Sequence, residues 1–220
     1  MIKIWDGWVR LFHWSLVALV LLLFVSGKTG AGFYEWHKLA GEAVLALLLF
    51  RLLWGIFGSD NAKLHRLITN PVHGLKHIWH LITGTVSHYR GHNPAGGWAV
   101  IIMLLLLLFQ AVTGVFIADE DELVEGAFYG ALSYDLSDTL WYLHTLNGST
   151  LLPGMLLLHI LMPLFYYLRA KQNLILPMLT GNMAWRDESV APLVRFAPWW
   201  VGALLLMCSS LLMGWIMRWF

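Results

Sequence analysis

Cysteine is almost absent from this sequence of 220 residues, which contains only Cys208. A single cysteine excludes a disulfide within the chain, a cysteine-ligated iron–sulfur cluster and the CxxCH motif that attaches haem covalently. Charged side chains are scarce as well, since Asp, Glu, Lys and Arg together make up 12% of the residues. Hydrophobic residues make up 59%, and the mean hydropathy is +0.66. This composition excludes a soluble globular domain.

The apolar residues gather into five runs that are long enough to cross a bilayer as helices. We predict spans over residues 8–25, 37–57, 98–118, 140–168 and 198–217. No cleavage pattern follows the first span, so we interpret it as an uncleaved helix and not as a signal peptide. Trp and Tyr gather near the span ends, as expected at membrane interfaces. The sequence therefore predicts an all-α integral membrane protein with four helices in residues 1–182 and a fifth in a C-terminal extension, 183–220.

The basic residues indicate the orientation of these spans. With the N-terminus in the cytoplasm, only Lys28, Lys38 and Arg218 fall outside. The other eleven fall inside: Lys3, Arg10, Arg51, Lys63, Arg66, Lys76, Arg90, Arg169, Lys171, Arg186 and Arg195. Because cytoplasmic loops carry an excess of Lys and Arg, we predict a cytoplasmic N-terminus.

Two connections between spans have distinct compositions. Residues 71–87, on the cytoplasmic side, form a predicted amphipathic helix with His73, His77 and His80 at i, i+4 and i+7. That spacing suits a metal ion, but it also suits the polar face of a helix in the headgroup region, which we favour. The outer connection, residues 119–138, holds seven acidic residues and no basic one. We interpret it as an outer loop that either is simply solvated or docks a basic redox partner.

Two histidines lie within the fourth span, His144 and His159. In a helix they are ~22 Å apart along the axis and only about 60° apart around it. One therefore lies near each membrane face, and both point to the same side. Histidine inside a membrane is costly, so each is a candidate functional residue.

Two further histidines match these positions in depth. The first span runs outward and places His13 near the inner face, while the second runs inward and places His37 near the outer face. The pairs are then His37 with His144, and His13 with His159. A lone membrane histidine often only bonds a backbone carbonyl, but two depth-matched pairs favour axial ligation of two haem irons between helices.

Smaller features accompany the pairs. Gly41 and Gly148 each follow a histidine of the outer pair by four residues, where a porphyrin edge would leave no room for a side chain. Arg10 and Arg51 are placed to contact inner haem propionates, and Lys38 to contact outer ones. Glu42 and Gln110 either bond across helices, which we favour, or lie near a quinone.

The sequence resembles the prokaryotic cytochrome b561 family in four stretches. They are Trp5-Asp6-Gly7-Trp8-Val9-Arg10-Leu11-Phe12-His13-Trp14, His37-Lys38-Leu39-Ala40-Gly41-Glu42, Arg51-Leu52-Leu53-Trp54-Gly55 and Gly91-His92-Asn93-Pro94-Ala95-Gly96-Gly97-Trp98. The resemblance covers roughly residues 1–182 and extends to the cytochrome subunits of nickel–iron hydrogenases and formate dehydrogenases. It implies a four-helix haem-binding core with two non-covalent haems b, ligated from helices one, two and four. The acidic loop and the fifth span depart from the family pattern.

This resemblance implies electron relay across the inner (plasma) membrane of a bacterium, between a quinone pool and an outer redox partner. We expect that partner to be a c-type cytochrome, whose basic surface the acidic loop would attract, or an oxidoreductase complex. One alternative is superoxide oxidation with quinone reduction, against which the acidic loop argues because it repels an anion. From another class come a histidine-rich metal transporter and a membrane anchor subunit, neither of which needs a visible chromophore.

Overall fold

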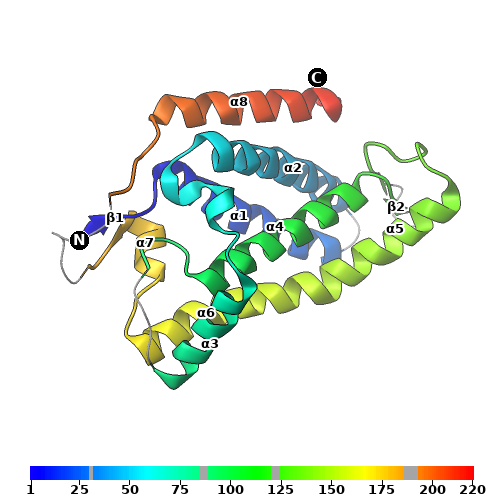
Figure 1. Cartoon of the computed structure of the whole chain (residues 1–220). Helices are drawn as coiled ribbons and strands as arrows, with labels where there is room; N and C mark the ends of the chain where they lie inside the picture. Colours follow the sequence, from blue (N-terminus) through cyan, green and yellow to red (C-terminus); the bar gives the residue numbers. More distant parts are fainter. Residues whose placement is uncertain (30–31, 85–88, 120–123, 186–192) are drawn as a thin grey trace. The chain divides into compact units, whose positions relative to one another are not determined.

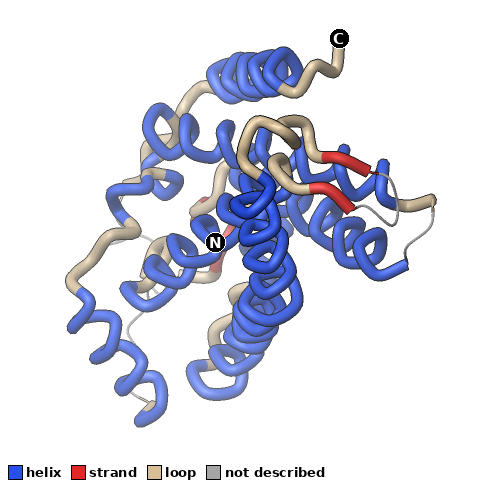
Figure 2. The backbone as a smooth tube through the Cα atoms, turned by 90° about the vertical axis from the view of Figure 1, so that its right-hand side faces the viewer, coloured by secondary structure: helices blue, strands red, loops and turns tan. Residues whose placement is uncertain are grey.

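The computed structural model describes residues 1–220 except 30–31, 85–88, 120–123 and 186–192. The protein is 73% helical, and its strands are only two residues long (Figures 1 and 2). The helices are α1 (Gly7–Thr29), α2 (Tyr34–Phe57), η1 (Asp60–Ala62), η2 (Leu64–Arg66), α3 (Pro71–Thr83), α4 (Pro94–Gly114), α5 (Tyr134–Leu146), the π-helix η3 (Asn147–Leu151), α6 (Leu152–Ala170), α7 (Ile175–Thr180) and α8 (Trp199–Ile216). The strands are β1 (Ile2–Lys3), β2 (Ala118–Asp119), β3 (Val124–Glu125) and β4 (Asn182–Met183).

Five helical segments of the described chain are long and apolar enough to cross a membrane. They are α1, α2, α4, the continuous segment Tyr134–Ala170 and α8. Each contains most of one predicted span, and the protein is an all-α, multi-pass membrane protein. Because lipid offers no hydrogen bonds, a helix that satisfies its own backbone groups is the stable form of such segments.

Several boundaries differ from those that we predicted. The fourth span begins at Tyr134 and not at residue 140, so Asp135 and Asp138 lie on α5 and not in a loop. The segment before it contains the antiparallel pair β2–β3, with Ala118 opposite Glu125. Glu120, Asp121 and Glu122 lie outside the described residues. The amphipathic helix ends at Thr83, because Gly84 adopts a left-handed conformation with φ of 86° and caps it.

The chain divides into two compact units. The first contains residues 1–11, 52–103 and 154–203, and the second contains residues 12–51, 104–153 and 204–220. In the first unit, strands β1 and β4 pair antiparallel, and the carbonyl of Gly181 accepts hydrogen bonds from the backbone of Ile4 and Trp5. This pairing joins the start of the chain to the segment that follows α7.

Asp6 organises the start of α1 in the first unit. One carboxylate oxygen accepts from the backbone N–H of Val9 at 2.8 Å, and the other accepts from the indole of Trp54 at 3.3 Å. The first bond caps the helix, because an aspartate before the first turn satisfies an otherwise free N–H. The second fixes Trp54, which is completely buried. Asp6 and Trp54 thus link two of the family-like stretches.

The amphipathic helix α3 docks on α6 through a buried hydrogen bond. The Nε2 atom of His77 lies 2.5 Å from the hydroxyl of Tyr166, and that hydroxyl also accepts from the side-chain amide of Asn93 at 2.9 Å. The guanidinium of Arg169 donates to the carbonyl of Ile82 at 2.7 Å, near the end of α3. Because the Asn93 amide donates, the Tyr166 hydroxyl donates to a neutral His77.

This bond predicts a pH-dependent docking of α3. Burial lowers the pKa of His77 below its ordinary value of 6.5, and the neighbouring His80 lowers it further. The undocked helix therefore binds more protons below about pH 6.5, so docking is fully stable above that pH and weakens as the pH falls toward the lowered pKa. We expect hydrogen-exchange protection factors of α3 to decline over this range in the wild type. The decline should vanish in His77→Leu. It should persist in the control His73→Leu, because His73 is exposed. A decline that persisted in His77→Leu, or that vanished in His73→Leu, would refute this interpretation.

Candidate functional site

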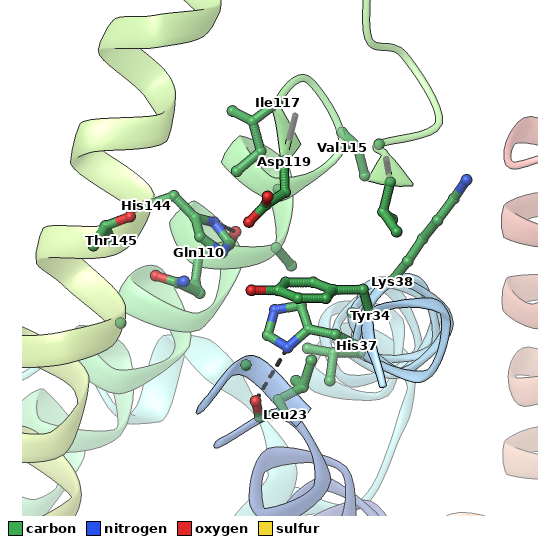
Figure 3. Close-up of a pocket in the computed structure, with 18 of the residues that line it drawn as sticks. Leu23, Tyr34, His37, Lys38, Gln110, Val115, Ile117, Asp119, His144 and Thr145 are labelled. Carbon is green, nitrogen blue, oxygen red and sulfur yellow. Dashed lines mark hydrogen bonds between the residues drawn. The ribbon is translucent and has the colours of Figure 1, made fainter. Parts of the chain in front are cut away.

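The second unit contains a cavity of about 430 Å³ that two of the predicted histidines line. Their imidazole ring centroids, of His37 on α2 and His144 on α5, lie 6.3 Å apart at an interplanar angle of 70°. Figure 3 shows the rings entering from different helices, with Tyr34 over the His37 ring and the Asp119 side chain reaching into the space beside them. We call this space the His37–His144 cavity.

A backbone carbonyl of α1 holds the ring of His37. The Nδ1 atom lies 3.1 Å from the carbonyl oxygen of Leu23, as drawn in Figure 3, and 3.2 Å from the hydroxyl of Ser26. A carbonyl can only accept, so Nδ1 carries the proton and donates. The Ser26 hydroxyl donates to the carbonyl of Leu22 at 2.7 Å, which leaves its oxygen free to accept as well. The lone pair of His37 is therefore on Nε2.

The ring of His144 is held in the same way by α4. Its Nδ1 atom lies 3.0 Å from the carbonyl oxygen of Gln110 and 3.0 Å from the hydroxyl of Thr113. Thr113 donates to the carbonyl of Phe109 at 2.9 Å. Both histidines thus donate from Nδ1 and keep the Nε2 lone pair available for a metal ion, which is the usual arrangement of ligating imidazoles.

A glycine follows each of these hydroxyl residues and lets the imidazole approach. A Cβ atom at Gly27 would lie 3.0 Å from Cε1 of His37, and one at Gly114 would lie 3.0 Å from Cε1 of His144. Our sequence reasoning missed both supports. The signal was the repeated tripeptide, Val25-Ser26-Gly27 and Val112-Thr113-Gly114, near the end of two apolar helices.

The two glycines that we predicted to make room for a cofactor both line the cavity. A Cβ atom at Gly41 would meet only Leu23 Cδ2, at 4.0 Å. A Cβ atom at Gly148 would lie 2.9 Å from Nε2 of Gln110, so this glycine also makes room for the glutamine. Gln110 is fixed by Asn147, whose amide donates to Oε1 at 2.7 Å. Gln110 therefore bonds across helices, which is the role that we favoured for it.

Asn147 opens the π-helix η3, which the sequence analysis did not predict. The side chain is almost fully buried, and its amide also donates to the carbonyl of Leu106 at 3.1 Å. A π turn inserts one residue into the helix and is frequent at functional sites. The π turn lies between His144 and α6, and Gly148 is one of its residues.

The remaining predicted residues are dispersed. Lys38 lines the cavity, but Figure 3 shows its side chain extending away from the two rings. Arg10 lies on α1 in the first unit, and its buried Nε has no hydrogen-bond partner among the described residues. Arg51 is buried in the second unit, with its guanidinium carbon 6.0 Å from the ring centroid of Phe12. All three assignments stay predictions.

The inner pair of histidines is divided between the units. His13 lies on α1 in the second unit, where its ring meets that of Trp14 edge to face at 4.9 Å. His159 lies on α6 in the first unit. Their pairing therefore stays a prediction. In the described part of the chain, no cluster of three His, Cys, Asp or Glu residues could hold a metal ion, and His77 of the α3 series bonds Tyr166 instead.

A family model described as prokaryotic cytochrome b561 matches residues 4–181. The chain belongs to the prokaryotic cytochrome b561 family. No curated protein and no solved structure matches the chain. This cytochrome b561 is a haem b-binding, multi-pass protein of the bacterial inner membrane that functions in electron transfer. Helix α8 of the cytochrome lies beyond the matched residues.

Proposed function

We propose that this cytochrome b561 relays electrons across the membrane through two bis-histidine haems b, between quinone and an outer redox partner. The observation that carries the proposal is the geometry of His37 and His144, with their rings 6.3 Å apart and each Nδ1 committed to a backbone carbonyl. Two imidazoles that bound one metal ion through a nitrogen, each at about 2.0 Å, would have ring centroids at most about 6.3 Å apart. The two rings therefore fit a shared iron.

The cavity around these rings also fits a porphyrin. Gly41 and Gly148 leave its walls without side chains one turn from each histidine, and its lining is largely apolar. The absence of a CxxCH motif means that haem would be held without a covalent link to the chain. His13 and His159 are the proposed ligands of the second, inner haem, and Arg10, with its unpartnered buried Nε, is a proposed donor to an inner propionate.

Bound haem supplies a one-electron couple. With histidine at both axial positions, no coordination site is open for dioxygen or substrate, so the protein's task is to fix the ligands and exclude water. The carbonyls of Leu23 and Gln110 raise the basicity of the imidazoles by accepting their Nδ1 protons. A more basic ligand favours the oxidised iron, which makes these bonds determinants of the potential.

A potentiometric titration of the purified protein tests this function. We expect b-type bands in the reduced-minus-oxidised spectrum that titrate as two one-electron components. If the protein had no visible chromophore, a metal transporter or a membrane anchor subunit would be favoured. If only one component titrated, the protein would bind only one haem.

Removing the Thr113 hydroxyl should raise the potential of the outer haem. Thr113→Val keeps the shape of the side chain and the Gln110 carbonyl but deletes one acceptor of the His144 Nδ1 proton. If the stabilisation of the oxidised form falls tenfold, the midpoint rises by about 59 mV. Thr139→Val, at an exposed position of α5, is the control. Equal midpoints in the two variants would show that the hydroxyl does not tune the ligand.

The acidic segment should steer a basic partner. Converting Asp119, Glu120, Asp121 and Glu122 to their amides removes four negative charges near the predicted outer face. We expect electron exchange with a basic cytochrome c to slow by about tenfold at low salt. Its salt dependence should also flatten, because salt screens the attraction between the charges and the Debye length is only about 8 Å at physiological ionic strength. Haem content should stay constant. Stopped-flow rates equal to wild type from low to high salt would reduce this segment to solvated surface.

A further inference from the structure

The helix α3 packs on the rest of the first unit through one side only. Gly74, His77 and Leu81 are buried, and at about 100° per residue they share one side of the helix. This side contacts the protein, because His77 bonds Tyr166 and a Cβ atom at Gly74 would lie 3.8 Å from the backbone of Ala95. Every other residue of α3 is exposed.

The exposed surface of α3 is divided into an apolar face and a polar face. Large apolar side chains lie together within an arc of about 120°. They are Val72, Leu75, Ile78, Trp79 and Ile82, with exposed fractions from 43% to 68%. The ionisable side chains occupy the arc between this apolar face and the buried side. They are His73, Lys76 and His80.

Two neighbouring helices place α3 at the level where membrane spans end. Gly74 lies against Pro94 and Ala95, the first residues of α4. The guanidinium of Arg169, one residue before α6 ends, donates to the carbonyl of Ile82 at 2.7 Å, and Figure 1 shows α3 beside α6. Both of these helix ends lie on the predicted cytoplasmic side. The helix α3 therefore lies near the boundary between acyl chains and headgroups.

The pattern of faces on α3 matches a lipid surface. A surface helix of a soluble domain buries its apolar stripe against the core, whereas α3 buries a different side and leaves the apolar face exposed. A helix with Lys on one face and Trp and Leu on another lies in the membrane interface, with the apolar face among the acyl chains. Trp79 is of the residue type that gathers at this boundary.

Lys76 provides the charge that selects among lipids. Its side chain is exposed and forms no ion pair with the described residues, so the ammonium group can bind a phosphate. The cytoplasmic leaflet carries a negative surface potential, which attracts basic residues at this level. Arg169 is the nearest basic residue of α6 that the structure places against α3, and its guanidinium is engaged by the carbonyl of Ile82.

We propose that α3 is a binding site for anionic phospholipids of the cytoplasmic leaflet. Their acyl chains contact the apolar face around Leu75 and Trp79, and their phosphates bind Lys76. Because such lipids bind the docked helix, they stabilise its packing on Tyr166 and Ala95. The inference concerns a surface outside the haem-binding residues and does not depend on the proposed electron relay.

Nitroxide accessibility tests the orientation of the apolar face. The purified full-length protein carries Cys208→Ser, so that a label at Leu75→Cys is the only one, and lies in nanodiscs of phosphatidylglycerol and phosphatidylcholine. We expect this label to collide more often with oxygen, which concentrates among acyl chains, than with a water-soluble nickel chelate. A label at His73→Cys, on the polar face, should show the reverse order. Equal access of the chelate to both labels, or exclusion of both reagents from Leu75 by a protein partner or a second copy, overturns the inference.

Hydrogen exchange of α3 tests the selectivity for anionic lipid. One basic residue near an anionic surface favours binding by about fivefold. At alkaline pH, where the docking of α3 is stable, protection of α3 should rise by about this factor from phosphatidylcholine to phosphatidylglycerol nanodiscs. Lys76→Gln should abolish the rise. Arg66→Gln, the matched control, should keep it, because that guanidinium already lies 3.4 Å from the carboxylate of Asp60.

The absence of a rise in the wild type, or an equal rise in Lys76→Gln and Arg66→Gln, overturns the inference. Neither result concerns the haems, so the proposed function would stand. The reduced-minus-oxidised spectrum of each variant, recorded in the same nanodiscs, tests that function separately.

Discussion

His144→Ala should reduce the haem content from two per chain to one, with the outer component lost and the inner one retained. The imidazole of His144 is fixed by Gln110 and Thr113 beside His37, and alanine offers the iron no ligand. His37→Ala should remove the same component. His159→Ala should remove the other, because the ligand pairs are predicted at opposite membrane faces, ~22 Å apart along one helix.

The measurement is a potentiometric titration of each variant with haem quantitation. His73→Ala is the control, because His73 is an exposed residue of α3 and should keep both components. The pairing would be wrong if His144→Ala and His159→Ala lost the same component, or if His37→Ala and His144→Ala lost different ones.

Gly148→Leu should likewise exclude the outer haem. Even a Cβ atom at this position would lie 2.9 Å from the Gln110 amide, which Asn147 holds in place, so a leucine side chain has to extend into the cavity that Gly148 lines. We expect the outer component to fall to a small fraction of its wild-type amount while the inner component persists.

Gly154→Leu is the matched control for this substitution. Gly154 lies in the same continuous helical segment, and nothing lies within 4 Å of a Cβ atom added there. It should keep both haems. If Gly148→Leu also kept both with unchanged spectra, the glycine would serve helix packing alone.

Hydropathy and local capping predicted most of the fold. The five apolar runs correspond to the five candidate spans, because only a self-satisfied helix is stable in lipid. Two helices, α3 and α4, begin at the prolines of the pairs Asn70-Pro71 and Asn93-Pro94. The Asn70 side chain accepts from the backbone of Val72 at 2.9 Å, and that of Asn93 accepts from Gly96 at 2.8 Å. Such caps depend on a few adjacent residues, which a sequence displays directly.

Features that depend on contacts between distant residues were not predicted. The π turn at Asn147 is accompanied by side-chain bonds to Leu106 and Gln110 on another helix, and the turn after α8 brings Trp219 to a partner 177 residues away. The hydropathy pattern of neighbouring residues indicates neither the bonds of Asn147 nor the bond of Trp219. The carbonyls of Leu23 and Gln110 that hold the two histidines were missed because a backbone carbonyl has no sequence signature of its own; only the neighbouring Ser-Gly and Thr-Gly pairs mark their positions. Glu42 on α2 accepts from Trp219, which lies beyond the end of α8, so this bond joins a helix to the turn that follows α8 and not two helices.

Haem quantitation of the purified, intact protein tests the central claim most directly. Extraction into acid acetone followed by the pyridine haemochrome assay, normalised to chain concentration, should give two haems b per chain and leave no haem on the protein. One haem per chain would contradict the two depth-matched pairs, and none would contradict ligation by His37 and His144 altogether. Haem that resisted extraction would contradict non-covalent binding.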